Sequence, residues 1–163
     1  MEQYYFKKIR ELIKEKSALE KKLNVIITIN GKLVKIEGSA IDEYQAGLVI
    51  EAMQFGFSAK KALLLLNEDI IFRVIPIKMF TRRKNLKEVR GRIIGKDGKT
   101  KRTIENIAEC EVEINGNEVG IICSADELEE TTTAITNLIR GTKEANVYGF
   151  LEKMNANKKK LNN

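Results

Sequence analysis

Hydrophobic and polar positions alternate or recur with helical spacing in both halves of this 163-residue chain. In the second half, these periods predict strands over 74–77, 111–114 and 119–123, and helices over 86–94, 99–108 and 124–139. Asn115-Gly116 is typical of a two-residue hairpin turn. Ser124-x-x-Glu127 has the form of a capping box, and Gly141 is placed to end the last helix. Residues from Val147 onward favour a C-terminal helix, with a frayed polar tail from residue 155.

The first half repeats this pattern. Residues 29–40 can be laid over 114–125 at an offset of 85 positions. Continued to Gly56 and Gly141, the ungapped alignment has nine identities in 28 positions. The elements expected in the first half are strands over 25–29 and 33–36, a helix over 39–54 capped by Ser39-x-x-Asp42, and a short connecting helix near 58–67.

The repeat predicts two copies of one α+β module. Each copy is expected to have the order strand, helix, helix, strand, strand, helix, with a small three-stranded antiparallel sheet packed against helices. The expected modules span residues 1–70 and 71–163. Upstream of the aligned segment the offset is taken as 81, which pairs Leu12-Ile13 with Ile93-Ile94 and Leu23 with Ile104.

The second copy contains Gly95-Lys96-Asp97-Gly98 between its first two expected helices. Glycines at both ends of a short turn let the backbone approach a ligand closely, because no Cβ stands in the way. The following helix would direct its unpaired N–H groups and positive dipole end at the same place. Asp97 is awkward for a phosphate, and we expect its side chain to cap that helix.

Charge is concentrated around this turn. Residues 82–105 hold ten Lys or Arg and three acidic residues, whereas the whole chain has a net charge of +6. Such a localised basic patch is typical of nucleic-acid binders. The bland alternative is a solvated helix face, and Arg82-Arg83-Lys84 could equally be a solvated linker. The glycine turn within the patch favours a phosphate ligand.

Composition limits the classes of function. The chain has no histidine, which removes the commonest general base and metal ligand. Cys110 and Cys123 are expected to be buried free thiols on or beside neighbouring strands. A P-loop reading of Gly98-Lys99-Thr100 fails, because Ile93 stands where the upstream glycine is required. We therefore expect no catalytic residue, metal or cofactor.

No apolar run approaches the roughly 20 residues that span a bilayer. The N-terminus also lacks the apolar core of a signal peptide. A cytoplasmic protein with no membrane partner is expected.

The segment Ile93-Ile-Gly-Lys-Asp-Gly-Lys99, followed by Ile104, resembles the KH family of single-stranded nucleic-acid binders in its type I topology. Residues 91–106, Asn137–Gly141 and Val147–Gly149 together resemble archaeal tandem-KH ribosome-assembly proteins, relatives of the eukaryotic "partner of Nob" factor. The resemblance implies binding to the 3′ region of small-subunit rRNA during subunit maturation. It also implies cooperation with a Nob-type endonuclease, and contact with the alpha subunit of translation initiation factor two.

The expected RNA-binding residues lie in and around the glycine turn. They are Arg82, Arg83, Arg92, Ile93, Ile94, Gly95, Lys96, Asp97, Gly98, Lys99, Lys101, Arg102, Ile104 and Ile114. The cations would contact phosphates or base edges, and the isoleucines would form an apolar floor beneath the bases. Plain core packing is an equal alternative for each isoleucine.

In the first copy, the offset of 81 places Lys14-Glu15-Lys16-Ser17 at the Gly-x-x-Gly positions. Side chains at both glycine positions and the charge of Glu15 disfavour close approach of a phosphate. RNA binding is therefore assigned to the second copy, and the first is expected to be a packing partner or a protein-binding surface. The leading hypothesis is a non-catalytic RNA-binding assembly factor. The alternative is a protein–protein adaptor with incidental RNA affinity.

Overall fold

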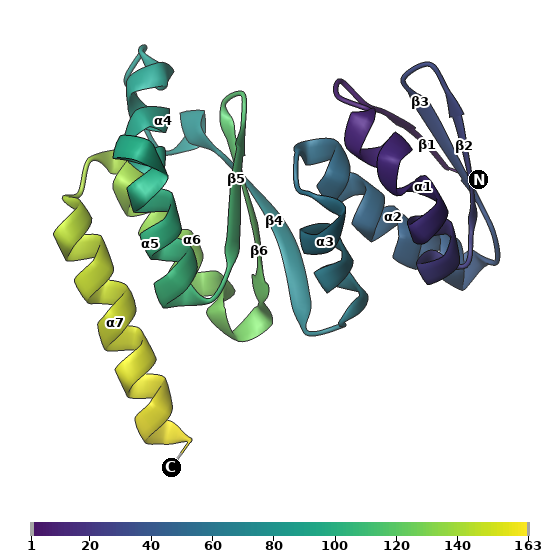
Figure 1. The fold of residues 1–163 in the computed structure, drawn as a ribbon. Helices are drawn as coiled ribbons and strands as arrows, with labels where there is room; N and C mark the ends of the chain where they lie inside the picture. Colours follow the sequence, from purple (N-terminus) through teal and green to yellow (C-terminus); the bar gives the residue numbers. More distant parts are fainter. Residues whose placement is uncertain (1, 163) are drawn as a thin grey trace. The chain divides into compact units, whose positions relative to one another are not determined.

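The computed structural model describes residues 2–162, and the chain folds as two compact units, residues 1–72 and 73–163 (Figure 1). Each unit has its own three-stranded antiparallel sheet.

Unit 1 has the sheet order β1-β3-β2. Its elements are β1 (Glu2–Tyr5), α1 (Arg10–Leu23), β2 (Ile26–Asn30), β3 (Leu33–Glu37), α2 (Ala40–Phe55), α3 (Ala59–Ala62) and a 3-10 turn, Leu63–Leu66. Val34 and Ile36 of β3 are buried while Leu33, Lys35 and Glu37 are exposed, so one face of the sheet packs against helices.

The expected connecting helix near 58–67 is α3 followed by the 3-10 turn. It packs against α1 and α2 within unit 1. Three aromatic rings pack together near the end of unit 1 in the sequence. Phe55, Phe57 and Phe72 lie with their ring centroids 5.7 to 6.0 Å apart, an arrangement in the range of favourable aromatic pairs.

Unit 2 has the sheet order β4-β6-β5. Its elements are β4 (Ile70–Pro76), in which the boundary between the units falls, a 3-10 turn (Ile77–Met79), α4 (Leu86–Ile94), a 3-10 turn (Lys96–Gly98), α5 (Lys99–Ala108), β5 (Glu111–Asn115), β6 (Glu118–Ser124), α6 (Ala125–Arg140) and α7 (Glu144–Leu161). The bounds of α4 and α5 agree with those expected from sequence. Strand β4 is longer than expected at its start, and Pro76 is its last residue, as its missing N–H favours.

Unit 2 has the expected order of two helices before the hairpin, but unit 1 does not. A single continuous helix, α1, stands where α4, the glycine turn and α5 stand in unit 2. The expectation of two such helices in both modules is therefore wrong for unit 1. No glycine interrupts residues 10–23, so nothing in the sequence favours a break there.

A polar network at the end of α5 locates the true correspondence between the units. The Glu105 carboxylate accepts a hydrogen bond from the backbone N–H of Val112 at 3.1 Å, and Lys101 Nζ lies 3.4 Å from the same carboxylate. The helix ends at Ala108, and the next residue, Glu109, has a left-handed φ of 51°. The network joins α5 to the first residues of β5.

The same network recurs in unit 1, each member 85 positions earlier. The Glu20 carboxylate accepts from the N–H of Ile27 at 3.0 Å, and Lys16 Nζ lies 3.9 Å from it. Asn24, the residue after α1, likewise has a left-handed φ of 54°. The offset of 85 therefore continues upstream into the helix.

This correspondence corrects the expected offset of 81. At an offset of 85, Leu19 is the equivalent of Ile104, and both are buried. Lys14-Glu15-Lys16-Ser17 is then no degenerate loop but the middle of α1. The positions that match Gly95–Gly98 are residues 10–13, the first turn of α1.

The helices that follow each hairpin are capped differently. The Ser39 hydroxyl accepts from the N–H of Asp42 at 3.2 Å, so the expected cap of α2 is confirmed. Ser124 is the residue before α6, but its side chain makes no capping hydrogen bond within the described chain. The capping box is therefore absent there, and Glu127 pairs with Lys158 of α7 instead.

Helix α7 continues to Leu161, so the expected fraying from residue 155 is wrong. It packs against α5 and α6, as Figure 1 shows. Asn155 Nδ2 donates to the carbonyl of Ile107 at 2.6 Å, and Lys158 Nζ lies 3.2 Å from both Glu127 and Glu130. These tertiary contacts hold a segment whose polar composition alone suggested a loose end.

Candidate nucleic-acid interface

The glycine turn joins α4 to α5 through backbone conformations that favour glycine. Gly95 has φ 75° and ψ 175°, and Gly98 has φ 75° and ψ 13°. Asp97 between them is also left-handed, at φ 54°, a conformation that Asp tolerates better than most residues. The N–H of Gly95 donates to the carbonyl of Gly91 at 2.8 Å, and that of Gly98 to Gly95 at 3.2 Å. The turn is thus joined by backbone hydrogen bonds to the end of α4 and across its own two glycines.

Gly95 is required by the protein's own packing as well as by its φ. A Cβ at this position would lie 2.1 Å from Thr100 Oγ1 and 2.7 Å from the Thr100 backbone nitrogen. Thr100 is buried in the first turn of α5 and cannot move aside freely. At Gly98 the nearest atom to a Cβ would be Arg102 Nη1 at 3.0 Å, the end of a flexible side chain. Gly95 is therefore the less replaceable of the two.

Helix α5 begins at Lys99, directly after the second glycine, as the sequence predicted. Gly98 is the residue before the helix, and Asp97 does not cap it. The expected capping role of Asp97 is therefore wrong. Its left-handed backbone is the geometry that lets the turn close.

The cations of the turn and of the start of α5 fall into two groups, those that are exposed and one that is paired with a carboxylate. Lys96, Lys99 and Arg102 are exposed beside the turn, where the N-terminus of α5 adds its positive dipole end. Lys101 is instead only partly exposed and bound to Glu105. Since Lys16 and Glu20 make the same pair in a unit without a glycine turn, the Lys101 pair is a structural feature of the fold. Lys101 as an RNA contact stays a prediction, and its ammonium is already paired with Glu105.

The four isoleucines also divide. Ile93 and Ile104 are fully buried in the core of unit 2, so the core alternative holds for both. Ile94 is 38% exposed beside the turn, and Ile114 on β5 is half-buried against the core. Only these last two can offer an apolar surface to a base, while Ile93 and Ile104 support it from beneath.

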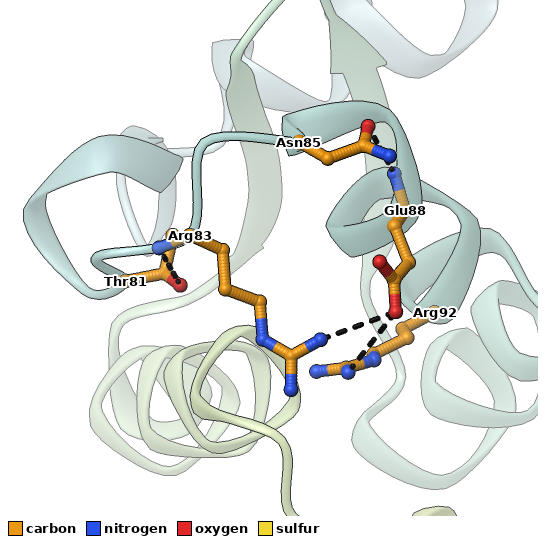
Figure 2. A network of polar contacts seen from close by, with 5 residues as sticks. All are labelled: Thr81, Arg83, Asn85, Glu88 and Arg92. Carbon is orange, nitrogen blue, oxygen red and sulfur yellow. Dashed lines mark hydrogen bonds and ion pairs between the residues drawn. The ribbon is translucent and has the colours of Figure 1, made fainter.

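Upstream arginines reach the same region. Figure 2 shows Arg83, from the segment before α4, and Arg92, near the end of α4, pointing at the carboxylate of Glu88. Arg83 Nη1 lies 3.1 Å from Glu88 Oε1, and Arg92 Nη2 lies 3.6 Å from the same oxygen. Arg82 is exposed. Both predicted site arginines of this pair are therefore engaged by one acidic residue.

Sequence reasoning missed two residues that shape the region. Thr100 fills the space behind Gly95. Arg90 Nη1 donates to Asn117 Oδ1 at 2.6 Å and lies 3.4 Å from the Gly116 carbonyl, which ties the β5–β6 turn to α4. A buried polar residue in a first helical turn and a half-buried arginine are the signals, but neither is visible without the fold.

Both cysteines are buried free thiols, and burial raises their pKa, to about 11 for Cys123. In residues 2–162 no cluster of three His, Cys, Asp or Glu side chains could hold a metal ion. No helix in that range is long and apolar enough to cross a membrane.

In unit 2, a strand, two helices joined by Gly-x-x-Gly, a β-hairpin and a further helix define a KH domain of type I. Comparison with known families narrows the class. The model of the second KH domain of PNO1, described as a eukaryotic-type KH domain (KH-domain type I), matches residues 71–156. The chain belongs to this PNO1 family of KH proteins, which confirms the family expected from the sequence.

Named relatives agree with this assignment. The chain is 30% identical to a KH domain-containing protein of Methanocaldococcus jannaschii, over 85% of this chain and 64% of the relative. It is 32% identical to the pre-rRNA-processing protein pno1 of Aspergillus fumigatus, over 82% of this chain and 56% of the relative. This chain therefore spans about three fifths of the length of these relatives.

A solved structure has the same fold. The structure of an a/eIF2alpha–aDim2p–rRNA complex from Pyrococcus horikoshii matches with a TM-score of 0.85 and 31% identity, covering 96% of this chain and 94% of that chain.

Proposed function

We propose that unit 2 binds single-stranded RNA at the Gly95–Gly98 turn, and that the RNA is the 3′ region of small-subunit rRNA during subunit maturation. The observation that carries this proposal is the closed glycine turn, with three exposed cations beside it, in a unit that belongs to a KH family. A relative named for pre-rRNA processing, and a structural neighbour whose described complex contains rRNA, support the same RNA class.

The binding mechanism is physical and breaks no bond. The turn lets the RNA backbone approach within contact distance, and a KH turn of this kind clamps about four nucleotides. Lys96, Lys99 and Arg102 neutralise phosphates, while Ile94 and Ile114 offer apolar contact to bases. No aromatic residue occurs between residues 82 and 114, so stacking on aromatic rings contributes little to the affinity.

The protein acts without catalysis in the cytoplasm. Its protein partners are a Nob-type endonuclease and the alpha subunit of translation initiation factor two. The second partner is supported by the Pyrococcus complex, whose description includes a/eIF2alpha.

A charge reversal in the turn tests RNA binding. Lys96→Asp, which makes the turn Gly-Asp-Asp-Gly, should weaken binding to a single-stranded rRNA oligonucleotide at least tenfold, because it sets two carboxylates against the phosphate path. Fluorescence anisotropy at fixed salt measures this. The matched control is Lys14→Asp in α1 of unit 1, which makes the same change in charge and should leave the affinity within about twofold.

The adaptor function has one observation in its favour. On α2 of unit 1, Ile41 and Tyr44 are 72% and 69% exposed, three residues apart on one helix face. If Lys96→Asp left RNA affinity unchanged while Ile41→Ser with Tyr44→Ser abolished a protein complex, the adaptor would replace the RNA-binding proposal. Crosslinking in cell extract, followed by sequencing of the bound RNA, identifies the rRNA site.

A further inference from the structure

Glu88 differs from the other two acidic residues of the basic segment, because it has no part in the glycine turn or in the contact between α5 and β5. Residues 82–105 contain three acidic residues, Glu88, Asp97 and Glu105. Glu105 bonds to the backbone of β5, and Asp97 adopts the left-handed conformation that closes the turn. Glu88 instead lies exposed among cations that the RNA would need.

The geometry around Glu88 is convergent (Figure 2). One carboxylate oxygen, Oε1, receives Arg83 from one side at 3.1 Å and Arg92 from the other at 3.6 Å. Local bonds hold this arrangement: the Arg83 N–H donates to Thr81 Oγ1 at 3.2 Å, and the Glu88 N–H donates to Asn85 Oδ1 at 3.4 Å. Two guanidinium groups from separate segments are thus aimed at one anionic atom.

Arg92 is held in place but not fully satisfied. Its Nη1 is buried and has no hydrogen-bond partner among the described residues. The same atom lies 3.3 Å from the place a Cβ of Gly141 would occupy, so the turn between α6 and α7 confines the guanidinium. Leaving a buried charged donor unpaired is costly. A guanidinium has five N–H donors, and a phosphate offers more acceptor oxygens than the single one that Glu88 presents to both arginines.

We propose that Arg83 and Arg92 form a second phosphate site, which the Glu88 carboxylate fills in the free protein and a phosphate of the RNA backbone fills in the complex. This inference rests on the proposed RNA binding and adds a contact outside the glycine turn. Arg92 is only three residues from Gly95 along the chain. An RNA clamped by the turn therefore presents its neighbouring phosphate to this site at high effective concentration.

The exchange makes Glu88 a selectivity residue. A free anion, or a strand that is not bound at the turn, must displace the carboxylate in a separate binding step. Its net gain in binding free energy at the two arginines is therefore small. A strand already clamped at Gly95–Gly98 displaces it intramolecularly. Glu88 thus lowers non-specific affinity more than it lowers affinity for RNA seated in the groove.

A double-mutant cycle on the full chain tests this exchange. Glu88→Gln keeps the shape of the side chain and removes its charge. It should raise the affinity for a single-stranded rRNA oligonucleotide roughly two- to fivefold, the equivalent of losing weak competing ion pairs. Arg83→Gln with Arg92→Gln should lower the affinity and reduce the slope of log K against log salt by about 0.7, the value for one phosphate of a single strand.

The arginine pair must be what Glu88 competes for. In the background of both arginine substitutions, Glu88→Gln should therefore give no gain. If the gain persisted there, or if Glu109→Gln, which removes another exposed carboxylate of unit 2, matched it, general electrostatics would explain the effect and the exchange would be wrong. A loss of affinity in Glu88→Gln would also overturn it.

Lys96→Asp separates the two proposals. If Lys96→Asp abolishes binding but the cycle shows no coupling, RNA binding at the turn stands and the second site fails. If Lys96→Asp leaves affinity unchanged, the proposed function itself fails, whatever the cycle shows.

Discussion

The two units share one framework and differ at the place where RNA binding is proposed. Both have a lysine, a glutamate and a strand N–H joined in the same way, 85 positions apart. Unit 2 has an additional helix, α4, before this framework, and the glycine turn joins α4 to α5. Unit 1 begins the corresponding helix directly, at Arg10.

The difference lies in an added helix as well as in two lost glycines. The turn is closed from both sides, by Gly91 of α4 through a hydrogen bond and by Thr100 of α5 through packing. Arg83, Glu88 and Arg92 also depend on α4 or on the segment leading into it. Unit 1, which lacks that helix, keeps its own core but has no edge equivalent to the one proposed to face RNA in unit 2.

The largest effect should come from Gly95→Ala. The added methyl would overlap Thr100, and the φ and ψ of residue 95 are accessible almost only to glycine. We therefore expect a loss of about 2–4 kcal/mol in the stability of unit 2. RNA affinity should fall more than tenfold. Chemical denaturation and RNA binding measure the two effects.

Its matched control is Arg10→Ala, at the equivalent position of unit 1. Arg10 is exposed in the first turn of α1. Its replacement should therefore change the free energy of unfolding of unit 1 by no more than about 0.5 kcal/mol. Comparable losses at both positions would contradict the claim that only unit 2 has a turn.

A smaller effect is expected from breaking the shared framework. Glu105→Ala should destabilise unit 2, and Glu20→Ala unit 1, by about 1–2 kcal/mol, because each leaves a strand N–H without its charged acceptor. The loss should be larger at Glu105, which is less exposed than Glu20. Denaturation followed by NMR signals from each unit checks this. A loss of stability in only one unit would show that the Glu20 and Glu105 networks do not contribute equally to the stability of their units.

The smallest effect concerns α7, which has 18 residues where α3, the helix that begins 85 positions earlier in unit 1, has four. Burial opposes the charge of Lys158, but its hydrogen bonds to Glu127 and Glu130 outweigh this and raise its pKa. A pKa above the unfolded value means that the stabilisation is complete below pH 10.5 and is lost as pH rises through the raised pKa. Docking of α7 should therefore weaken only in strong alkali.

Methyl NMR of Leu151, buried on α7, can follow that loss. In Lys158→Met the alkaline transition should disappear, with unit 1 signals unaffected in both proteins. A transition that survives the substitution would assign the pH dependence to another group.

Much of unit 2 was predictable from local pattern. The bounds of α4 and α5 follow from helical spacing on either side of two glycines, and the hairpin at Asn115-Gly116 follows from turn chemistry. The same pattern predicts a wrong correspondence in unit 1, because it pairs Leu12-Ile13 with Ile93-Ile94. Apolar pairs recur in any amphipathic helix, so they cannot by themselves set the register of an alignment.

The sequence by itself determined the family, the hairpins, the glycine turn and the position of the basic patch, because these depend on residue type and spacing along the chain. Only the tertiary structure decided which cations are exposed without an acidic partner and which isoleucines are exposed enough to contact a base. Lys101 and Lys99 are two residues apart, yet one pairs with Glu105 and the other is exposed. Burial and ion pairing depend on residues brought together from distant segments, as Arg83 and Arg92 are at Glu88, and no local period records them.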